Sequence, residues 1–284
     1  MIMMPDDVIL KEMQTCQLRI LIDFQKVCDM NNIRFYLAFG TCLGAIRHHG
    51  FIPWDDDIDV FMRINDLNKL IEVQDQLPSR LYLQTHDKEP EFGLPIARIR
   101  DSSTTLVEAD HCDRDINHGV YIDIYPLFYC NENSVKMKVS VVESLICRLF
   151  IYNAPPSNKG SMFTIVSNIL LHLLPDSQKK KIGEYLYRKI VSQKKSKYVS
   201  NFPDISQGRF YNDEWFDEPV MADFEGVKMP LPSKASEFLT YYFHDYMQLP
   251  PENERQFHHH YLFADFHNSY LKYKGVEYCK SHET

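Results

Sequence analysis

The chain has 284 residues, of which 44% are hydrophobic, and this composition supports a packed core and excludes an intrinsically disordered protein. Its formal net charge of −8 disfavours a nucleic-acid-binding protein, because such proteins present a basic surface to the phosphate backbone. The seven cysteines include no Cys-x-x-Cys pair, which indicates a reducing compartment where thiols serve as small apolar residues.

The sequence gives no sign of a secretory signal or a membrane span. The first seven residues carry acidic side chains and lack a basic region followed by an apolar one. No apolar run reaches the roughly 18 residues that a spanning helix needs. We therefore expect a cytoplasmic protein.

The first part of the chain predicts a helix, a strand and a tight turn. Apolar residues recur at helical spacing over 6–31, and a strand is expected over 33–39. Gly40 and Thr41 follow, where backbone N–H groups can approach a phosphate without a side chain in the way. We expect Thr41 to cap a short helix that carries Arg47. For Gly40 alone, an ordinary structural turn is the simpler interpretation.

Four carboxylates then lie within five residues, at Asp55, Asp56, Asp57 and Asp59, just before an apolar strand at 60–62. Because side chains alternate along a strand, we expect Asp57 and Asp59 to share a face and Asp56 to point away. Neighbouring carboxylates repel each other unless a cation lies between them, and all-oxygen ligation suits Mg²⁺ or Mn²⁺. An acidic surface turn is the alternative.

Two arginines follow in the next strands. A helix is expected over 65–76, and strands over 80–84 and 92–100. Arg98 and Arg100 share one face of the second strand, ahead of a polar, turn-like stretch. They are candidates for holding the phosphates of a donor, or they form a solvated strand face.

A third candidate carboxylate interrupts an apolar run at Val120–Phe128. Burying an unpaired carboxylate is costly, so Asp123 is expected to bind a metal or to pair with an arginine such as Arg98.

The middle of the chain, 134–197, predicts up to three helices. The apolar run at 163–174 and the lysines at 179–181 are compatible with peripheral contact at the inner face of a membrane. A buried helix followed by a solvated one is the alternative.

The histidine cluster at 258–260 suggests zinc, with Asp265 and His267 nearby. Consecutive histidines do not project to one point, and structural zinc sites prefer spaced pairs. We expect histidines that are exposed or that contact an acceptor.

Three blocks of the sequence resemble the LicD family of phosphotransferases. The first runs from Phe39 to Asp59 and reads FGTCLGAIRHHGFIPWDDDID, the second surrounds Asp123, and the third contains Phe224-Glu225-Gly226 and Asp245-Tyr246-Met247. The family is related to the fukutin-type proteins and resembles polymerase-β-like nucleotidyltransferases. Two departures stand out: Phe128 replaces a second aspartate, and His244 replaces a glycine.

The resemblance implies an α/β (α+β) fold, in which helices flank a nucleotidyltransferase-like mixed sheet. We expect a catalytic core at 1–132, a helical insertion at 133–200 and a C-terminal segment at 201–284 that packs on the core.

The resemblance also implies the chemistry. Mg²⁺ or Mn²⁺ would be held by Asp57, Asp59 and Asp123, which are also the expected catalytic residues. The expected phosphate-binding residues are Gly40, Thr41, Arg47, Arg98 and Arg100. The donor would be CDP-linked, most simply CDP-choline, and the acceptor a glycan or glycolipid hydroxyl. A nucleotidyltransferase that releases pyrophosphate and a non-catalytic binding module are the alternatives.

Overall fold

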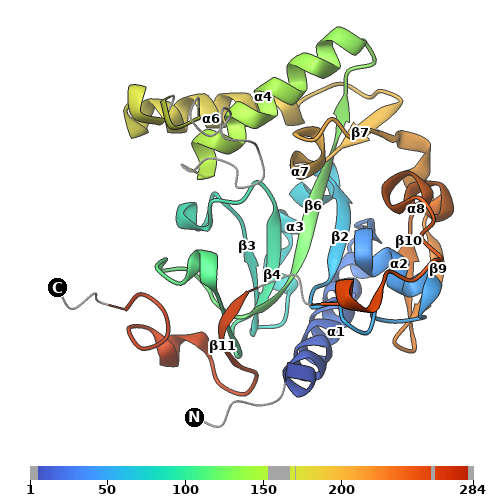
Figure 1. Cartoon of the computed structure of the whole chain (residues 1–284), viewed down its shortest axis with the longest axis vertical. Helices are drawn as coiled ribbons and strands as arrows, with labels where there is room; N and C mark the ends of the chain where they lie inside the picture. Colours follow the sequence, from blue (N-terminus) through green and yellow to red (C-terminus); the bar gives the residue numbers. More distant parts are fainter. Residues whose placement is uncertain (1–5, 153–166, 170, 257–259, 281–284) are drawn as a thin grey trace. The chain divides into compact units, whose positions relative to one another are not determined.

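The computed structural model describes residues 6–152, 167–169, 171–256 and 260–280 (Figure 1). Its helices and strands are α1 (Asp6–Met30), β1 (Phe35–Leu37), α2 (Phe39–Arg47), β2 (Asp59–Arg63), α3 (Ile64–Glu72), β3 (Leu81–Gln84), β4 (Ala97–Asp101), β5 (Thr105–Glu108), β6 (Val120–Cys130), α4 (Ser134–Tyr152), α6 (Asp176–Val191), β7 (Tyr198–Ser200), α7 (Phe202–Ile205), β8 (Tyr211–Asn212), β9 (Val220–Phe224), β10 (Val227–Leu231), α8 (Ala235–Phe243) and β11 (Tyr261–Asp265). The mixed α+β class predicted from the sequence is confirmed.

The chain divides into two compact units. The first comprises 1–92, 97–125 and 215–284, and the second comprises 93–96 and 126–214. The three-part division expected from the sequence stays a prediction.

The first unit is built on strands in the order β1-β2-β6-β4-β3. In the antiparallel pair of β4 and β6, Arg98 lies opposite Asp123. Directly opposed residues on one face of a sheet bring their side chains together, so the register itself pairs these two charges.

Helix α1 presents an apolar face to this sheet. Met13, Ile20, Phe24 and Val27 recur at helical spacing and are at most 2% exposed, as the sequence predicts. The Phe24 ring lies 4.9 Å from the Phe35 ring of β1. Burial of each such side chain contributes about 1.5–3 kcal/mol, so α1 is held firmly beside the loop that precedes β2.

The second unit has its own core, formed where α4, α6 and α7 meet the end of β6. Phe128 is 1% exposed and packs on Phe202 with ring centroids 5.2 Å apart. The residue that replaces the aspartate common in the family therefore serves as a core aromatic.

Several local predictions need correction. The strand expected over 92–100 begins only at Ala97, because Gly93 adopts a positive φ of 70° between two prolines. The polar stretch 102–105 was expected to be turn-like, and this is confirmed for 102–104, but Thr105 opens β5, which pairs with β11. His244 has a φ of 60° and a ψ of −109°, a conformation that glycine adopts without strain.

Two predictions concern residues outside the described part. The apolar run at 163–174, which was expected to be helical, falls partly there, as do two of the three histidines at 258–260. No helix among the described residues is long and apolar enough to cross a bilayer. All seven cysteines are free, and five of them are buried.

Candidate active site

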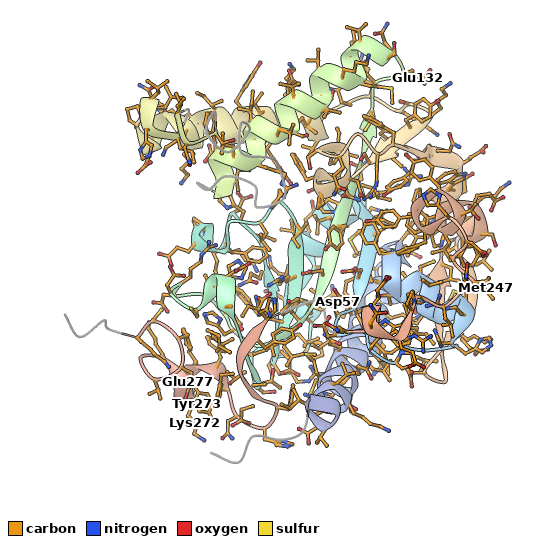
Figure 2. The ribbon with its side chains drawn as sticks, viewed as in Figure 1. Asp57, Glu132, Met247, Lys272, Tyr273 and Glu277 are labelled. Atoms are coloured by element: carbon orange, nitrogen blue, oxygen red, sulfur yellow. The ribbon has the colours of Figure 1, made fainter. Side chains whose placement is uncertain are left out.

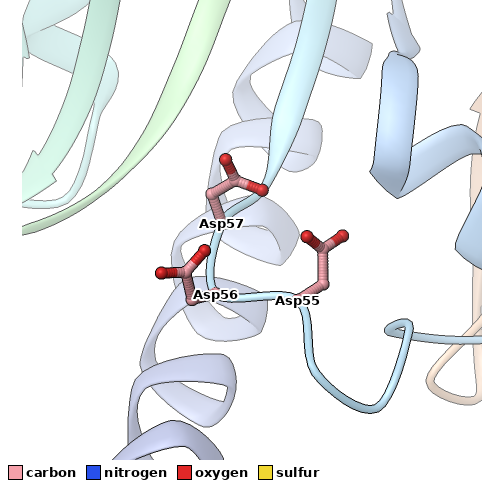
Figure 3. A group of neighbouring side chains, drawn as sticks. All are labelled: Asp55, Asp56 and Asp57. Carbon is pink, nitrogen blue, oxygen red and sulfur yellow. The ribbon is translucent and has the colours of Figure 1, made fainter. Parts of the chain in front are cut away.

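Three consecutive carboxylates gather in the loop that leads into β2. One oxygen from each of Asp55, Asp56 and Asp57 lies within 4.8 Å of the others (Figure 3). Asp55 and Asp56 are buried and Asp57 is half-buried. Regular strand geometry begins only at Asp59, so the alternation expected from the sequence does not extend to these three residues. The expectation that Asp56 points away from Asp57 is therefore wrong.

The loop is held in place by helices α1 and α2. From α1, Gln14 Nε2 donates to the Asp55 carbonyl (2.8 Å) and Gln17 Nε2 to the Asp56 carbonyl (2.9 Å). At the start of α2, a Cβ atom on Gly40 would lie 2.8 Å from Asp55 Oδ2. Only glycine leaves room there for the carboxylate.

Thr41 fixes the other end of the loop. The helix begins at Phe39 with Ala38 as its N-cap, so the expected capping role of Thr41 is wrong. Its Oγ1 instead accepts a hydrogen bond from the Asp59 backbone N–H (2.9 Å). The phosphate-binding role of Gly40 and Thr41 stays a prediction, and both lie in the first turn of α2, beside the acidic loop.

Asp59 carries the electrostatic signature of the site. Burial raises its pKa well above the usual range, and the charges of Asp57, Asp123 and Asp55 raise it further. Its Oδ1 is buried without a hydrogen-bond partner. The three predicted ligands therefore lie close enough to interact, and Asp55 joins them. A buried carboxylate oxygen without a donor, next to other carboxylates, suits a hard cation such as Mg²⁺.

Asp123 is paired with an arginine, which was one of the two alternatives. Arg98 Nε donates to Asp123 Oδ1 (2.6 Å), and Arg98 Nη1 donates to Glu108 Oε2 (2.7 Å). The guanidinium carbon lies 3.7 Å from the centroid of the Tyr121 ring. An ionised carboxylate has two oxygens that each accept several bonds, so this pairing leaves Asp123 able to bind a metal as well.

Glu108 was missed by the sequence analysis. Burial alone would raise its pKa, but Arg98, the hydrogen bond to His111 and Arg100 hold that pKa well below the usual range. The Tyr121 hydroxyl also donates to Glu108 Oε1 (2.7 Å). The sequence gives only a weak signal here, because Glu108 follows just two apolar residues, Leu106 and Val107, after a polar stretch.

Arg100 is fully buried. Its Nε donates a hydrogen bond to Gln84 Oε1 (2.7 Å), and its Nη1 donates one to the Gly119 carbonyl (2.7 Å). Its pKa is lowered by burial and by the charge of Arg98. Both arginines of β4 thus have protein partners, and their role in binding phosphate stays a prediction.

The C-terminal block holds the loop that precedes the acidic residues. Glu225 Oε1 accepts from the Phe51 N–H (3.0 Å), and the Glu225 N–H donates to the His49 carbonyl (2.9 Å). A Cβ atom on Gly50 would lie 2.1 Å from Glu225 Oε1, so this contact requires a glycine. Arg47 Nη1 donates to the Tyr246 carbonyl (2.7 Å). Two of the sequence blocks therefore meet in space.

We expect the change Glu108→Gln to destabilise the protein by about 3–5 kcal/mol, because it leaves two buried guanidiniums without their shared carboxylate. Folding lowers the pKa of Glu108. Its contribution to the free energy of unfolding is therefore fully present at a pH above the ordinary pKa of a carboxyl group, and it is lost as the pH falls through the pKa of the folded state. Urea unfolding at several pH values measures both effects.

The matched control is Glu237→Gln, since Glu237 is half-exposed and lies 3.9 Å from Lys234. A surface pair of this kind contributes at most about 1 kcal/mol. Equal losses in the two variants would show that Glu108 does not balance buried charge.

Comparisons with known proteins find sequences similar to this chain. Residues 32–144 match the family described as LicD/FKTN/FKRP, nucleotidyltransferase domain. The chain is 29% identical over 264 residues to the lipopolysaccharide cholinephosphotransferase LicD of Haemophilus influenzae, covering 88% of this chain and 96% of that protein. It is 28% identical over 163 residues to mannosyltransferase regulator 4 of Saccharomyces cerevisiae, covering 54% of this chain and 13% of that protein. The predicted resemblance is confirmed.

Proposed function

We propose that this chain, which carries a LicD-type nucleotidyltransferase domain, is a metal-dependent transferase that moves a phospho-substituent to a hydroxyl group of a cell-surface glycan precursor. Phosphocholine from CDP-choline is the first candidate, and the reaction would take place on the cytoplasmic side. One observation carries the proposal. The chain matches a named cholinephosphotransferase over nearly its full length, and the acidic site lies within the matched domain.

The proposed reaction is a displacement at phosphorus. The acceptor hydroxyl oxygen forms a bond to the phosphorus that bears choline, and the bond from that phosphorus to the CMP oxygen breaks. The hydroxyl proton passes to Asp123, which the contact with Arg98 keeps oriented. CMP leaves with the electron pair of the broken bond.

The acidic residues would hold the metal. Asp57 and Asp59, with Asp55 or Asp123, offer the carboxylate oxygens that Mg²⁺ or Mn²⁺ prefers. When bound, such an ion supplies charge stabilisation at the phosphate oxygens. Thr41 holds the start of β2 through its hydrogen bond to the Asp59 N–H, and Gly40 leaves room for the Asp55 carboxylate.

We expect Mn²⁺ binding to identify which carboxylates hold the ion. The ion has two possible sets of ligands: the loop group of Asp55, Asp56 and Asp57, or the predicted set of Asp57, Asp59 and Asp123. Because Asp57 belongs to both sets, Asp57→Asn should weaken Mn²⁺ binding in either case. Electron paramagnetic resonance of free Mn²⁺ measures the affinity without any turnover. The loss should be about tenfold or more, equivalent to about 1.4 kcal/mol.

Two further variants separate the arrangements. If Asp123→Asn weakens binding and Asp55→Asn does not, the ion lies in the predicted set. The opposite result places it in the loop. Glu237→Gln is the control, and unchanged Mn²⁺ affinity in all the aspartate variants would contradict the metal site.

The products decide between the proposed function and its alternative. The matched family is described as a nucleotidyltransferase domain, which favours transfer of a whole nucleotide as the second candidate. We expect incubation with CDP-choline, Mg²⁺ and a glycan precursor to release CMP and to add one phosphocholine to the acceptor. Mass spectrometry of the acceptor measures this. In a parallel incubation with an NTP in place of CDP-choline, a gain of one nucleotide by the acceptor, with release of pyrophosphate, would contradict the proposal.

A further inference from the structure

Two arginines, a histidine and a tryptophan form a cluster of neighbouring side chains, and all but one of the four come shortly before the acidic loop in the sequence. Arg47 Nε lies 3.0 Å from His48 Nε2, and the His48 and Trp54 ring centroids are 6.3 Å apart. The Arg255 guanidinium carbon lies 5.3 Å from the centroid of the Trp54 ring. All four side chains are half-buried, so solvent and ligands can reach them. Arg255 and Trp54 have no role in the site described above.

One short segment fixes both arginines. Arg47 Nη1 donates to the carbonyls of Tyr246 (2.7 Å) and Gln248 (3.4 Å), and Arg255 Nε donates to the carbonyl of Pro250 (3.0 Å). This segment also carries Met247, which is 56% exposed (Figure 2). Each guanidinium has five N–H donors, so these bonds leave several of them available.

Among the described residues, neither guanidinium of the cluster forms an ion pair with a carboxylate, although the chain carries a net charge of −8. Burial lowers the pKa of Arg47, and the charge of Arg255 lowers it further. The repulsion between two like charges is unfavourable, and an anion bound between them would offset it.

The position of the cluster indicates which anion this is. Trp54 directly precedes Asp55, and Arg47 lies on helix α2, whose Gly40 approaches the Asp55 carboxylate, so the cluster and the acidic loop are built from the same two segments of the chain. Guanidinium groups bind phosphate oxygens through charge-assisted hydrogen bonds, which are among the stronger hydrogen bonds in proteins.

We propose that Arg47 and Arg255 form the binding site for the phosphates of a nucleoside diphosphate, with Trp54 stacked against Arg255 to orient it. This assignment rests on the proposed function, because it gives these residues to the nucleotide half of the donor. It adds Arg255 and Trp54 to the donor-binding residues, and it makes no claim about which group is transferred.

Calorimetric titration with CDP and with cytidine, at one fixed Mg²⁺ concentration, tests the assignment. Arg255→Gln should weaken CDP binding about tenfold, equivalent to about 1.4 kcal/mol, and should leave cytidine binding unchanged. Arg255→Lys should retain part of the affinity, because lysine keeps the charge but loses the planar fork. The control is Arg34→Gln, since Arg34 pairs with Glu218 on the surface of the same unit and should not affect CDP.

A salt series on the unaltered protein provides a test without any variant. CDP affinity should fall with rising NaCl much more steeply than cytidine affinity, because only the phosphates interact with the arginines. The assignment is overturned if CDP affinity is the same in folded Arg255→Gln, if cytidine binding falls equally, or if CDP and cytidine respond equally to salt.

CMP release from CDP-choline by the unaltered protein separates this assignment from the proposed function. If no CMP forms but Arg255 still controls CDP affinity, the phosphate site is supported and the proposed function fails. If CMP forms and Arg255 does not affect CDP affinity, the proposed function survives and the phosphate site is wrong.

Discussion

The balance of buried charge around Arg98 is the constraint on which the first unit depends. This guanidinium is 4% exposed and contacts both Asp123 and Glu108. At about 4 Å, two unit charges interact by roughly 4 kcal/mol at an effective dielectric constant of 20, so removing any one partner is costly. The arginine therefore holds the pKa of Glu108 well below its usual range and pairs with Asp123 inside the buried part of the sheet.

The same arrangement leaves negative charge concentrated at the start of β2. Asp59 lies near Asp57, Asp123 and Asp55, and its Oδ1 has no hydrogen bond. Burial and these neighbours favour the protonated form of its carboxyl. A divalent cation would reverse that preference. A bound cation would therefore offset the repulsion between these carboxylates and the cost of burying them.

Contacts between distant segments keep this loop in place. Glu225 bonds to the backbone on both sides of Gly50, and Arg47 reaches the carbonyl of Tyr246. Strand β11 pairs with β5, which carries Glu108. The N-terminal blocks therefore do not build the site alone, and the C-terminal residues from 215 onward complete the first unit.

Local features of the fold and of the site could be predicted from the sequence, whereas features that depend on loops or on distant segments were missed. The apolar face of α1 and the interrupted strand around Asp123 are local patterns, and both were predicted correctly. The contribution of Asp55 was missed because the sequence argument used the alternation of side chains along a strand, whereas a loop brings this carboxylate into the group. The pairing of β5 with β11 joins residues about 160 positions apart, and such long-range pairs leave no local signal.

The replacement of Gly by His244 shows a second limit. The sequence revealed an unusual residue at a turn, but only the backbone angles show that the turn keeps a conformation suited to glycine. Likewise, the sequence placed Arg98 and Arg100 on one face correctly. It could not show that Gln84, Glu108, Asp123 and the Gly119 carbonyl already occupy their donors.

Thermal unfolding at increasing Mg²⁺ concentration shows whether the carboxylates around Asp59 hold a cation. If the carboxylates around Asp59 form a cation site, Mg²⁺ should raise the melting temperature of the unaltered protein and then saturate. Ligand present at 100 times its dissociation constant stabilises the folded state by about 2.7 kcal/mol. We expect the melting temperature to rise with Mg²⁺ but not with K⁺ at equal ionic strength. In Asp59→Asn, Mg²⁺ should no longer raise the melting temperature. No rise, or an equal rise in Asp59→Asn, would contradict the cation site.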